Sequence, residues 1–222
     1  MSLSRNPKHP HIILAAGLYN NNADLIDAVH RIGYLTDQQL VLDMTYGRGT
    51  FWKRYRPARL ITNSLGKATS LHSDMTRMPF PDGVFDVVVC DPPYKLNGTP
   101  DADVDERYGV HVVTRRDDRH ALMYAALTEA IRLTVPGGLI LYKCQQQVNS
   151  GRVWWQPRMM AEHAEPYGCR HRDSFLLLGS RAQPGDDDPE KEQDHARQNY
   201  STLMVIERGA PVDPEEAQGV LL

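Results

Sequence analysis

Cysteine is scarce in this chain, whose 222 residues contain only Cys90, Cys144 and Cys169. Two of these lie in apolar, strand-like runs, and an odd number argues against a disulfide framework. Long hydrophobic runs are absent as well, because no stretch approaches the ~20 apolar residues that span a membrane. The N-terminus also lacks the apolar core of a signal peptide. We therefore expect a cytoplasmic protein that does not enter a membrane.

Neither a metal site nor a strong positive charge is indicated. His163, Cys169 and His171 lie close together in the sequence, but their spacing matches no standard zinc site. The net charge is −3, whereas proteins that bind nucleic acid use Lys and Arg at the phosphates. Local cationic clusters remain, and residues 53–59 carry four cations. Each such cluster is either a solvated face or a phosphate contact.

The turn after the apolar run at residues 40–43 contains glycine but lacks the other marks of common nucleotide loops. The run ends at Asp43, and Gly47 and Gly49 follow. Glycines placed in this way let the backbone approach a ligand closely. No third glycine follows at the dinucleotide spacing, which disfavours NAD. No Gly-Lys-Ser/Thr follows either, which disfavours the phosphate loop of an ATPase. Asp43 could accept a hydrogen bond from a cationic or hydroxylated ligand.

The most informative motif is Asp91-Pro92-Pro93-Tyr94, which directly follows the apolar run at residues 87–90. The Asp91 carboxylate and the Pro92 carbonyl can accept the two hydrogens of an exocyclic amine, and the prolines restrict φ and carry no competing N–H. Tyr94 can stack on the face of a planar base. Alone, the motif would equally suit an ordinary Asp-Pro turn at the end of a strand.

Four motifs taken in order resemble the amino-methyltransferases that modify adenine N6 or cytosine N4. Residues 43–50 are similar to the cofactor loop of that family, and residues 91–94 to its catalytic tetrapeptide. Residues 74–86 are similar to the segment lining the cofactor adenine, and residues 136–141 to the turn into the fifth strand. The resemblance implies S-adenosylmethionine as cofactor and a class I methyltransferase fold. It assigns catalysis to Asp91, Pro92, Pro93 and Tyr94, and cofactor binding to Asp43, Tyr46, Gly47, Gly49, Thr50, Asn63 and Asp74.

Two positions depart from the family pattern. The family often has an aromatic residue two positions before the first loop glycine, where this chain has Thr45 and places Tyr46 one residue later. The family usually ends its second strand with an acid that binds the ribose hydroxyls, whereas here the strand ends at Asn63. A neutral amide binds a hydroxyl less strongly than a carboxylate does.

The alternation of strands and helices between residues 40 and 144 predicts an α/β fold with a doubly wound, Rossmann-like sheet. We expect seven strands, mostly parallel, with helices on both faces. The last two strands have no helix between them, so we expect only the last strand to be antiparallel. The expected strands are 39–44, 59–63, 70–72, 84–90, 139–144, 174–178 and 201–206, and the expected helices are 22–33, 119–134 and 155–164.

The chain is expected to form one methyltransferase domain over residues 1–222, containing two loops. Residues 95–118 follow the tetrapeptide and form an active-site loop that closes over the target base, unless the segment is merely disordered. Residues 180–199 form an acidic, flexible hairpin loop that would repel phosphates. Target recognition is left to residues 95–118 or 149–172, and the latter include Trp154 and Trp155.

The resemblance implies a methyltransferase that acts on a nucleobase amine, with adenine N6 in DNA as the leading substrate, because the adenine enzymes more often have an acid where Asp91 stands. Two alternatives stay open. The chain could methylate an RNA base, or it could be a catalytically inactive subunit that keeps the cofactor fold. We expect nucleic acid as the partner, DNA before RNA, together with a possible homodimer or a second protein that supplies specificity.

Overall fold

The computed structural model describes residues 18–64, 69–96, 116–179 and 198–209. Most of both predicted loops, 95–118 and 180–199, therefore lies outside the described residues. The acidic hairpin loop and the single domain over residues 1–222 stay predictions. None of the helices in the described ranges is both long and apolar enough to cross a membrane.

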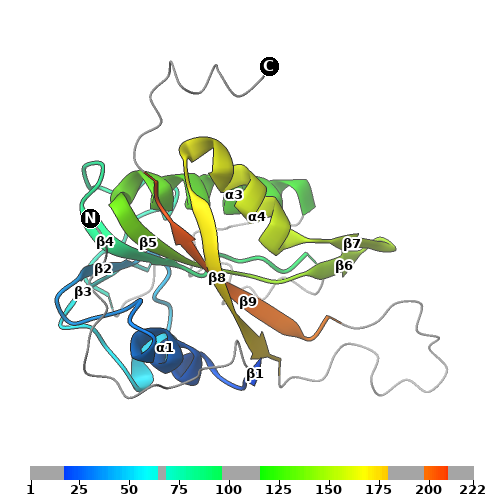
Figure 1. The fold of residues 1–222 in the computed structure, drawn as a ribbon. Coiled ribbons are helices and arrows are strands. Elements are labelled where there is room, and N and C mark those ends of the chain that lie inside the picture. The colour runs from blue at the N-terminus through cyan, green and yellow to red at the C-terminus, as the bar shows by residue number, and fades with distance from the viewer. Residues whose placement is uncertain (1–17, 65–68, 97–115, 180–197, 210–222) are drawn as a thin grey trace.

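The described strands form one seven-stranded sheet and a separate two-stranded hairpin (Figure 1). The order across the large sheet is β1-β8-β9-β5-β4-β2-β3, and every neighbouring pair is parallel except the two that include β9. The fold is therefore mixed α/β with a mostly parallel sheet, as predicted. The strands are β1 Leu18–Tyr19, β2 Leu40–Asp43, β3 Arg59–Thr62, β4 Phe85–Cys90, β5 Thr134–Cys144, β8 Arg170–Leu178 and β9 Tyr200–Glu207, and the hairpin is β6 Gln147–Asn149 with β7 Arg152–Trp154.

Both edges of the sheet differ from the prediction. Beyond β3, the expected strand at 70–72 forms only an isolated bridge between Leu71 and Asn63. At the opposite edge the sheet ends in the two-residue strand β1. The polar sequence around Leu71 offers too few apolar side chains to bury a full strand. The β6–β7 hairpin was not predicted, because its segments of three residues each are too short for a pattern of alternation to show.

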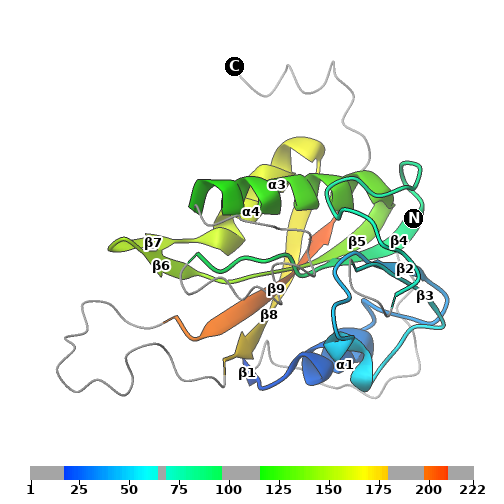
Figure 2. The ribbon, with the colours of Figure 1, turned by 180° about the vertical axis from the view of Figure 1, so that it is seen from behind.

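Helices cover both faces of the large sheet (Figures 1 and 2). On one face lie α1 and the 3₁₀ helix η1, and on the other lie α3 and α4. Successive side chains of a strand point to opposite faces, so β2, β4 and β5 feed both layers of the core. The helices are α1 Asn22–Arg31, η1 Thr50–Lys53, α3 Arg116–Leu133, α4 Gln156–Ala164 and the 3₁₀ helix η2 Glu165–Tyr167.

The helix boundaries are close to those expected from the sequence. The cap of α1 is Asn21 rather than Asn22, since its Oδ1 accepts the backbone N–H of Asp24 at 2.9 Å. Helix α3 begins at Arg116, three residues before the predicted start, so the predicted active-site loop is shorter at this end than 95–118. Asp117 and Asp118 stabilise this first turn by interacting with the positive end of the helix dipole.

Two side chains of α3 fasten the crossing segment between β3 and β4. Glu129 accepts the backbone N–H of Met78 at 2.6 Å and binds Arg132 at 2.7 Å. Arg132 in turn donates to the Phe80 carbonyl at 2.8 Å and to Asp82 at 2.6 Å. Glu129 is buried, so its charge depends on these partners. The network therefore anchors the segment that is predicted to line the cofactor adenine.

Replacing Glu129 by alanine should lower the free energy of unfolding by about 2 kcal/mol, because the buried N–H of Met78 would lose its acceptor. Urea unfolding followed by circular dichroism measures this loss. Glu162→Ala is the control, since Glu162 forms a pair with Arg158 at 2.7 Å that is exposed to solvent and should contribute little to stability. Equal losses in the two variants would contradict the anchoring role of Glu129.

Candidate active site

The site is built where the carboxyl ends of neighbouring parallel strands meet. Asp43 at the end of β2 is paired in register with Val89, and Asp91 follows β4 two residues later. Thr45 joins the two ends, because its hydroxyl accepts the backbone N–H of Asp91 at 2.7 Å and its own N–H donates to Asp43 at 2.9 Å. The tetrapeptide and the glycine turn are therefore brought together by the sheet.

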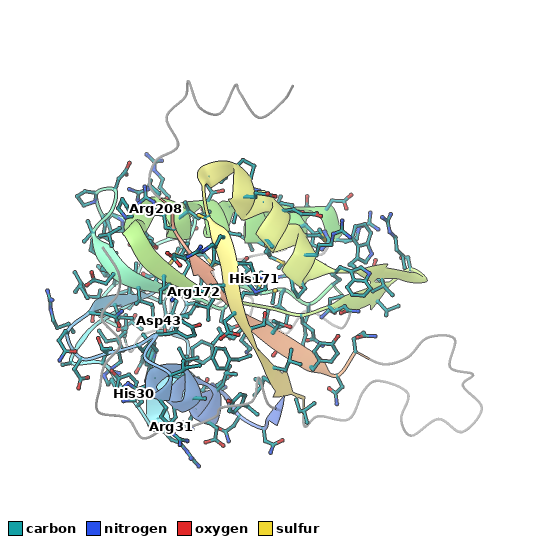
Figure 3. The ribbon with its side chains drawn as sticks, viewed as in Figure 1. His30, Arg31, Asp43, His171, Arg172 and Arg208 are labelled. Atoms are coloured by element: carbon teal, nitrogen blue, oxygen red, sulfur yellow. The ribbon has the colours of Figure 1, made fainter. Side chains whose placement is uncertain are left out.

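Asp43 is an anchor of the turn. Only 2% of it is exposed, and it lies on the side of the sheet that α1 covers (Figure 3). One carboxylate oxygen accepts the N–H of Thr45, and the other accepts the indole N–H of Trp52 at 2.7 Å. Burial raises the pKa of Asp43 to about 7, against the opposing effect of these two hydrogen bonds. The described contacts of Asp43 thus fix the loop, and its direct contact with a ligand stays a prediction.

The glycine turn has the backbone geometry that the sequence predicts. Gly47 and Gly49 have φ values of 54° and 66°, which strain any residue that carries a Cβ. A Cβ on Gly49 would also lie 2.6 Å from the hydroxyl of Tyr46. Tyr46 therefore packs against Gly49 in the turn. Thr50 begins η1, and its hydroxyl accepts a hydrogen bond from the Asn22 amide at 3.3 Å, which ties α1 to the turn.

Asn63, the predicted ribose contact, uses its side chain within the protein. It is 1% exposed, and its amide donates to the carbonyls of Met44 and Ser73 and accepts the Ser73 N–H. These bonds place Ser73 and the adjacent Asp74 beside the end of β2. Asp74 is exposed, and one of its oxygens accepts two bonds from Thr76. The geometry favours a positioning role for Asn63 and leaves Asp74 accessible.

The tetrapeptide directly follows β4, and a side chain at the start of α4 binds its backbone. Pro92 is buried, whereas Pro93 and Tyr94 are half-buried. The carbonyl of Tyr94 accepts a hydrogen bond from Gln156 at 2.8 Å, and Gln156 is fully buried at the start of α4. Within the described part of the chain, no donor is bonded to the carbonyl of Pro92.

Lys143 on β5 forms an ion pair with the Asp91 carboxylate, its Nζ lying 3.2 Å from Oδ2. Lys143, Thr45 and Gln156 were not among the predicted site residues. Lys143 had a usable signal, since it is the one charge in the run of residues 139–144 that otherwise predicts a buried strand. Thr45 had no such signal, because nothing local in the sequence shows that its hydroxyl would bond the residue that follows β4.

The described residues contain no group of three or more His, Cys, Asp or Glu side chains that could hold a metal ion. Cys169 is a free thiol. His163 is bonded to the hydroxyl of Thr128 at 2.8 Å, and His171 is bonded to its own strand at Ser174. Each of these two histidines thus has a partner in the fold.

No protein-family model and no curated protein matches this sequence. Solved structures do match. The Bacillus halodurans protein BH2331, provisionally described as a methyltransferase, has a TM-score of 0.52 at 13% identity, over 83% of this chain and 99% of that chain. The protein MccD has a TM-score of 0.51 at 11% identity, with 83% and 96% covered. The [4+2]-cyclase SpnF has a TM-score of 0.50 at 14% identity, with 84% and 80% covered.

Identities this low show a shared fold alone. The fold is mixed α/β and is consistent with that of class I methyltransferases. Because one of the similar structures is described as a cyclase, the fold by itself does not establish methyl transfer. Any assignment of function must therefore come from the residues of the site.

Asp43 should make the protein less stable as the pH rises towards neutrality. With its pKa raised from 3.8 to about 7, the folded state keeps a proton that the unfolded chain releases. This contribution to stability is fully present below pH 3.8 and is lost as the pH rises through the folded pKa of about 7. Since one pKa unit corresponds to about 1.4 kcal/mol, the loss is on the order of 4 kcal/mol.

Asp43→Asn should therefore flatten the dependence of the unfolding free energy on pH across this window, whatever its absolute stability. Denaturant unfolding at a series of pH values measures the slope. Asp27→Asn on α1 is the control for the general effect of replacing a carboxylate by an amide. A slope in Asp43→Asn equal to that of the parent protein would show that Asp43 is not the group responsible.

Proposed function

We propose that the protein transfers a methyl group from S-adenosylmethionine to an exocyclic amine of a nucleobase, with adenine N6 in DNA as the leading substrate. The observation that carries the proposal is the bond between Asp91 and Thr45, which seats the acid of the tetrapeptide beside the glycine turn. Without this bond, the order of the two motifs in the sequence would not determine where Asp91 lies.

The residues around the glycine turn fit the cofactor. Gly47 and Gly49 leave backbone exposed for close approach. The Oδ1 atom of Asn22, whose amide binds Thr50, is a buried acceptor without a partner in the described structure. Such an acceptor suits an ammonium or hydroxyl donor, and both occur in S-adenosylmethionine. When bound, the cofactor supplies an electrophilic methyl group on a sulfonium.

Asp91 and Pro92 would then act on the substrate amine. An aryl amine is a poor nucleophile because its lone pair is delocalised into the ring. Hydrogen bonds from the amine to a carboxylate oxygen of Asp91 and to the Pro92 carbonyl would favour a pyramidal nitrogen with its lone pair directed at the methyl carbon. The nitrogen forms the new N–C bond as the C–S bond breaks, and it then loses a proton to Asp91 or water. Positioning and preset acceptors supply most of the rate enhancement.

A second group of residues supports nucleic acid as the substrate. Trp155, just before α4, is 58% exposed. The neighbouring Trp154 lies between two guanidinium groups, those of Arg116 and Arg152, each 4.5 Å from its ring. An exposed aromatic beside cations suits a stacked base and a phosphate. The hairpin β6–β7, whose second strand carries Arg152 and Trp154, extends beyond the end of β5 (Figure 1).

Trp155 is linked to the tetrapeptide through its neighbour Gln156, whose buried side chain binds the carbonyl of Tyr94. We infer that a strand stacked on Trp155 would place its target base at Tyr94. DNA and RNA offer the same bases and phosphates here, so RNA is the second candidate substrate. The tetrapeptide and its paired acceptors support catalysis over the inactive-subunit alternative.

Asp91→Ala should lower the rate of methyl transfer at least about 100-fold, by removing a preset acceptor. The measurement is transfer of tritiated methyl groups to DNA, RNA and free nucleosides, followed by mass spectrometry of the nucleosides. Glu162→Ala is the control for general damage. Near-normal transfer by Asp91→Ala would refute the role of the carboxylate. Label in RNA alone would favour the second substrate, and no cofactor affinity in a binding titration would favour the inactive subunit.

Trp155→Ala should weaken binding of a single-stranded oligonucleotide by about 1–3 kcal/mol, because it removes a stacking platform. Fluorescence anisotropy with a labelled oligonucleotide measures the change at fixed salt. Tyr167→Ala on η2 is the matched control, since this aromatic is 45% exposed but belongs to a different part of the chain. Equal affinities for the two variants would argue against the proposed surface.

A further inference from the structure

Lys143 is a buried cation inside the proposed site. Register pairs Cys90 on β4 with Tyr142 on β5, so the following residues, Asp91 and Lys143, are neighbours across the two strands. The side chain of Lys143 is only 5% exposed. Lysine is rarely buried to this extent unless it is paired, because removing an ammonium group from water costs several kcal/mol. Its burial therefore depends on its partners.

Those partners surround the ammonium group. Its Nζ atom lies 3.2 Å from Oδ2 of Asp91, 5.4 Å from the ring centre of Phe51 and 5.8 Å from that of Tyr94. Aromatic faces attract a cation, and they do so more strongly where water is excluded. The ammonium group is thus held by one carboxylate and two rings that come from two segments, the tetrapeptide and η1.

The titratable groups that interact with this pair lie on three neighbouring strands. Asp43 is on β2, Cys90 is on β4, and Tyr142 and Cys144 flank Lys143 on β5. Burial raises the pKa of Asp91, and Lys143 opposes that rise. Burial acts to lower the pKa of Lys143, but Asp91 and Tyr94 outweigh it and the net shift is upward. Each partner therefore favours the ionised form of the other.

We propose that Lys143 is a positioning residue, which holds Oδ2 of Asp91 and keeps that carboxylate ionised so that Oδ1 accepts a hydrogen of the substrate amine. The inference rests on the proposed function. No bond to Oδ1 of Asp91 occurs within the described residues. A lysine suits the task because its ammonium group is a point charge, whereas the guanidinium fork of arginine would engage both oxygens.

The first test measures Asp91 directly and needs no turnover. The carboxyl carbon of Asp91 is followed by ¹³C NMR during a pH titration of the full chain, with Asp91→Asn used to assign its signal. In Lys143→Met the midpoint of this titration should move up by at least about one pH unit, as expected when an opposite charge is lost. Lys53→Met, an exposed lysine on η1, should leave it unchanged. An unchanged midpoint in Lys143→Met would overturn the proposal.

The second test uses methyl transfer. Lys143→Met should lower kcat at pH 7 about 100-fold with little change in the KM for the cofactor, and activity should recover as the pH rises and Asp91 ionises. A purely structural role would not produce this recovery at alkaline pH. Lys143→Gln keeps a donor to Asp91 without the charge, so it serves if the methionine variant does not fold, and it should shift the same pH profile by a smaller amount.

The outcomes separate the two proposals. If the parent protein transfers no methyl group to any substrate, the proposed function fails, while the NMR titration still decides whether Lys143 holds Asp91 ionised. If the parent protein is active but both Lys143 variants keep its pH profile and its kcat, the inference about Lys143 fails and the proposed function stands.

Discussion

Three ionisable side chains buried at one edge of the sheet are the constraint on which the site depends. Asp43, Asp91 and Lys143 stand at or just beyond the ends of β2, β4 and β5, which are adjacent and parallel. Parallel neighbours end at the same edge, so the charges must meet. Buried charge is tolerated only with partners. The bonds from Thr45 and Trp52 to Asp43, and from Lys143 to Asp91, supply them.

This requirement explains why so many side chains of the site face inward. Asp43 and Asn63 use their oxygens and amide hydrogens to hold the glycine turn and the segment at Ser73. What remains for a ligand is largely backbone, together with the accessible Asp74 and the tetrapeptide. A turn fixed in this way is preorganised, so binding would cost little additional ordering.

The shared fold is compatible with more than one chemistry, as its likeness to a cyclase and to a provisional methyltransferase shows. The acceptors at Asp91 and Pro92, and the bond from Asp91 to Thr45 beside the turn, distinguish this chain within that fold. The aromatic and cationic residues beyond β5 bear on the substrate rather than on the reaction. A bond from Gln156 to Tyr94 joins these two parts of the site.

Local pattern was sufficient for much of the fold and for the main motifs. Apolar runs indicated β2, β4, β5 and β9 because buried strands are long and continuous, and the cap at Asn21 was missed by only one residue. The strand wrongly predicted at 70–72 and the hairpin β6–β7 that was missed have a different cause from the boundary error at Asn21. Strands this short are decided by their neighbours in space, which the local sequence does not contain.

By itself, the sequence determined that Asp91 and the glycine turn each follow a buried strand, since hydrophobic runs and glycine turns are set by a few neighbouring residues. Only the tertiary structure decided that Thr45 bonds Asp91, that Lys143 neutralises it and that Asn63 is turned inward. Those contacts join residues up to 52 positions apart, and they depend on strand order and register.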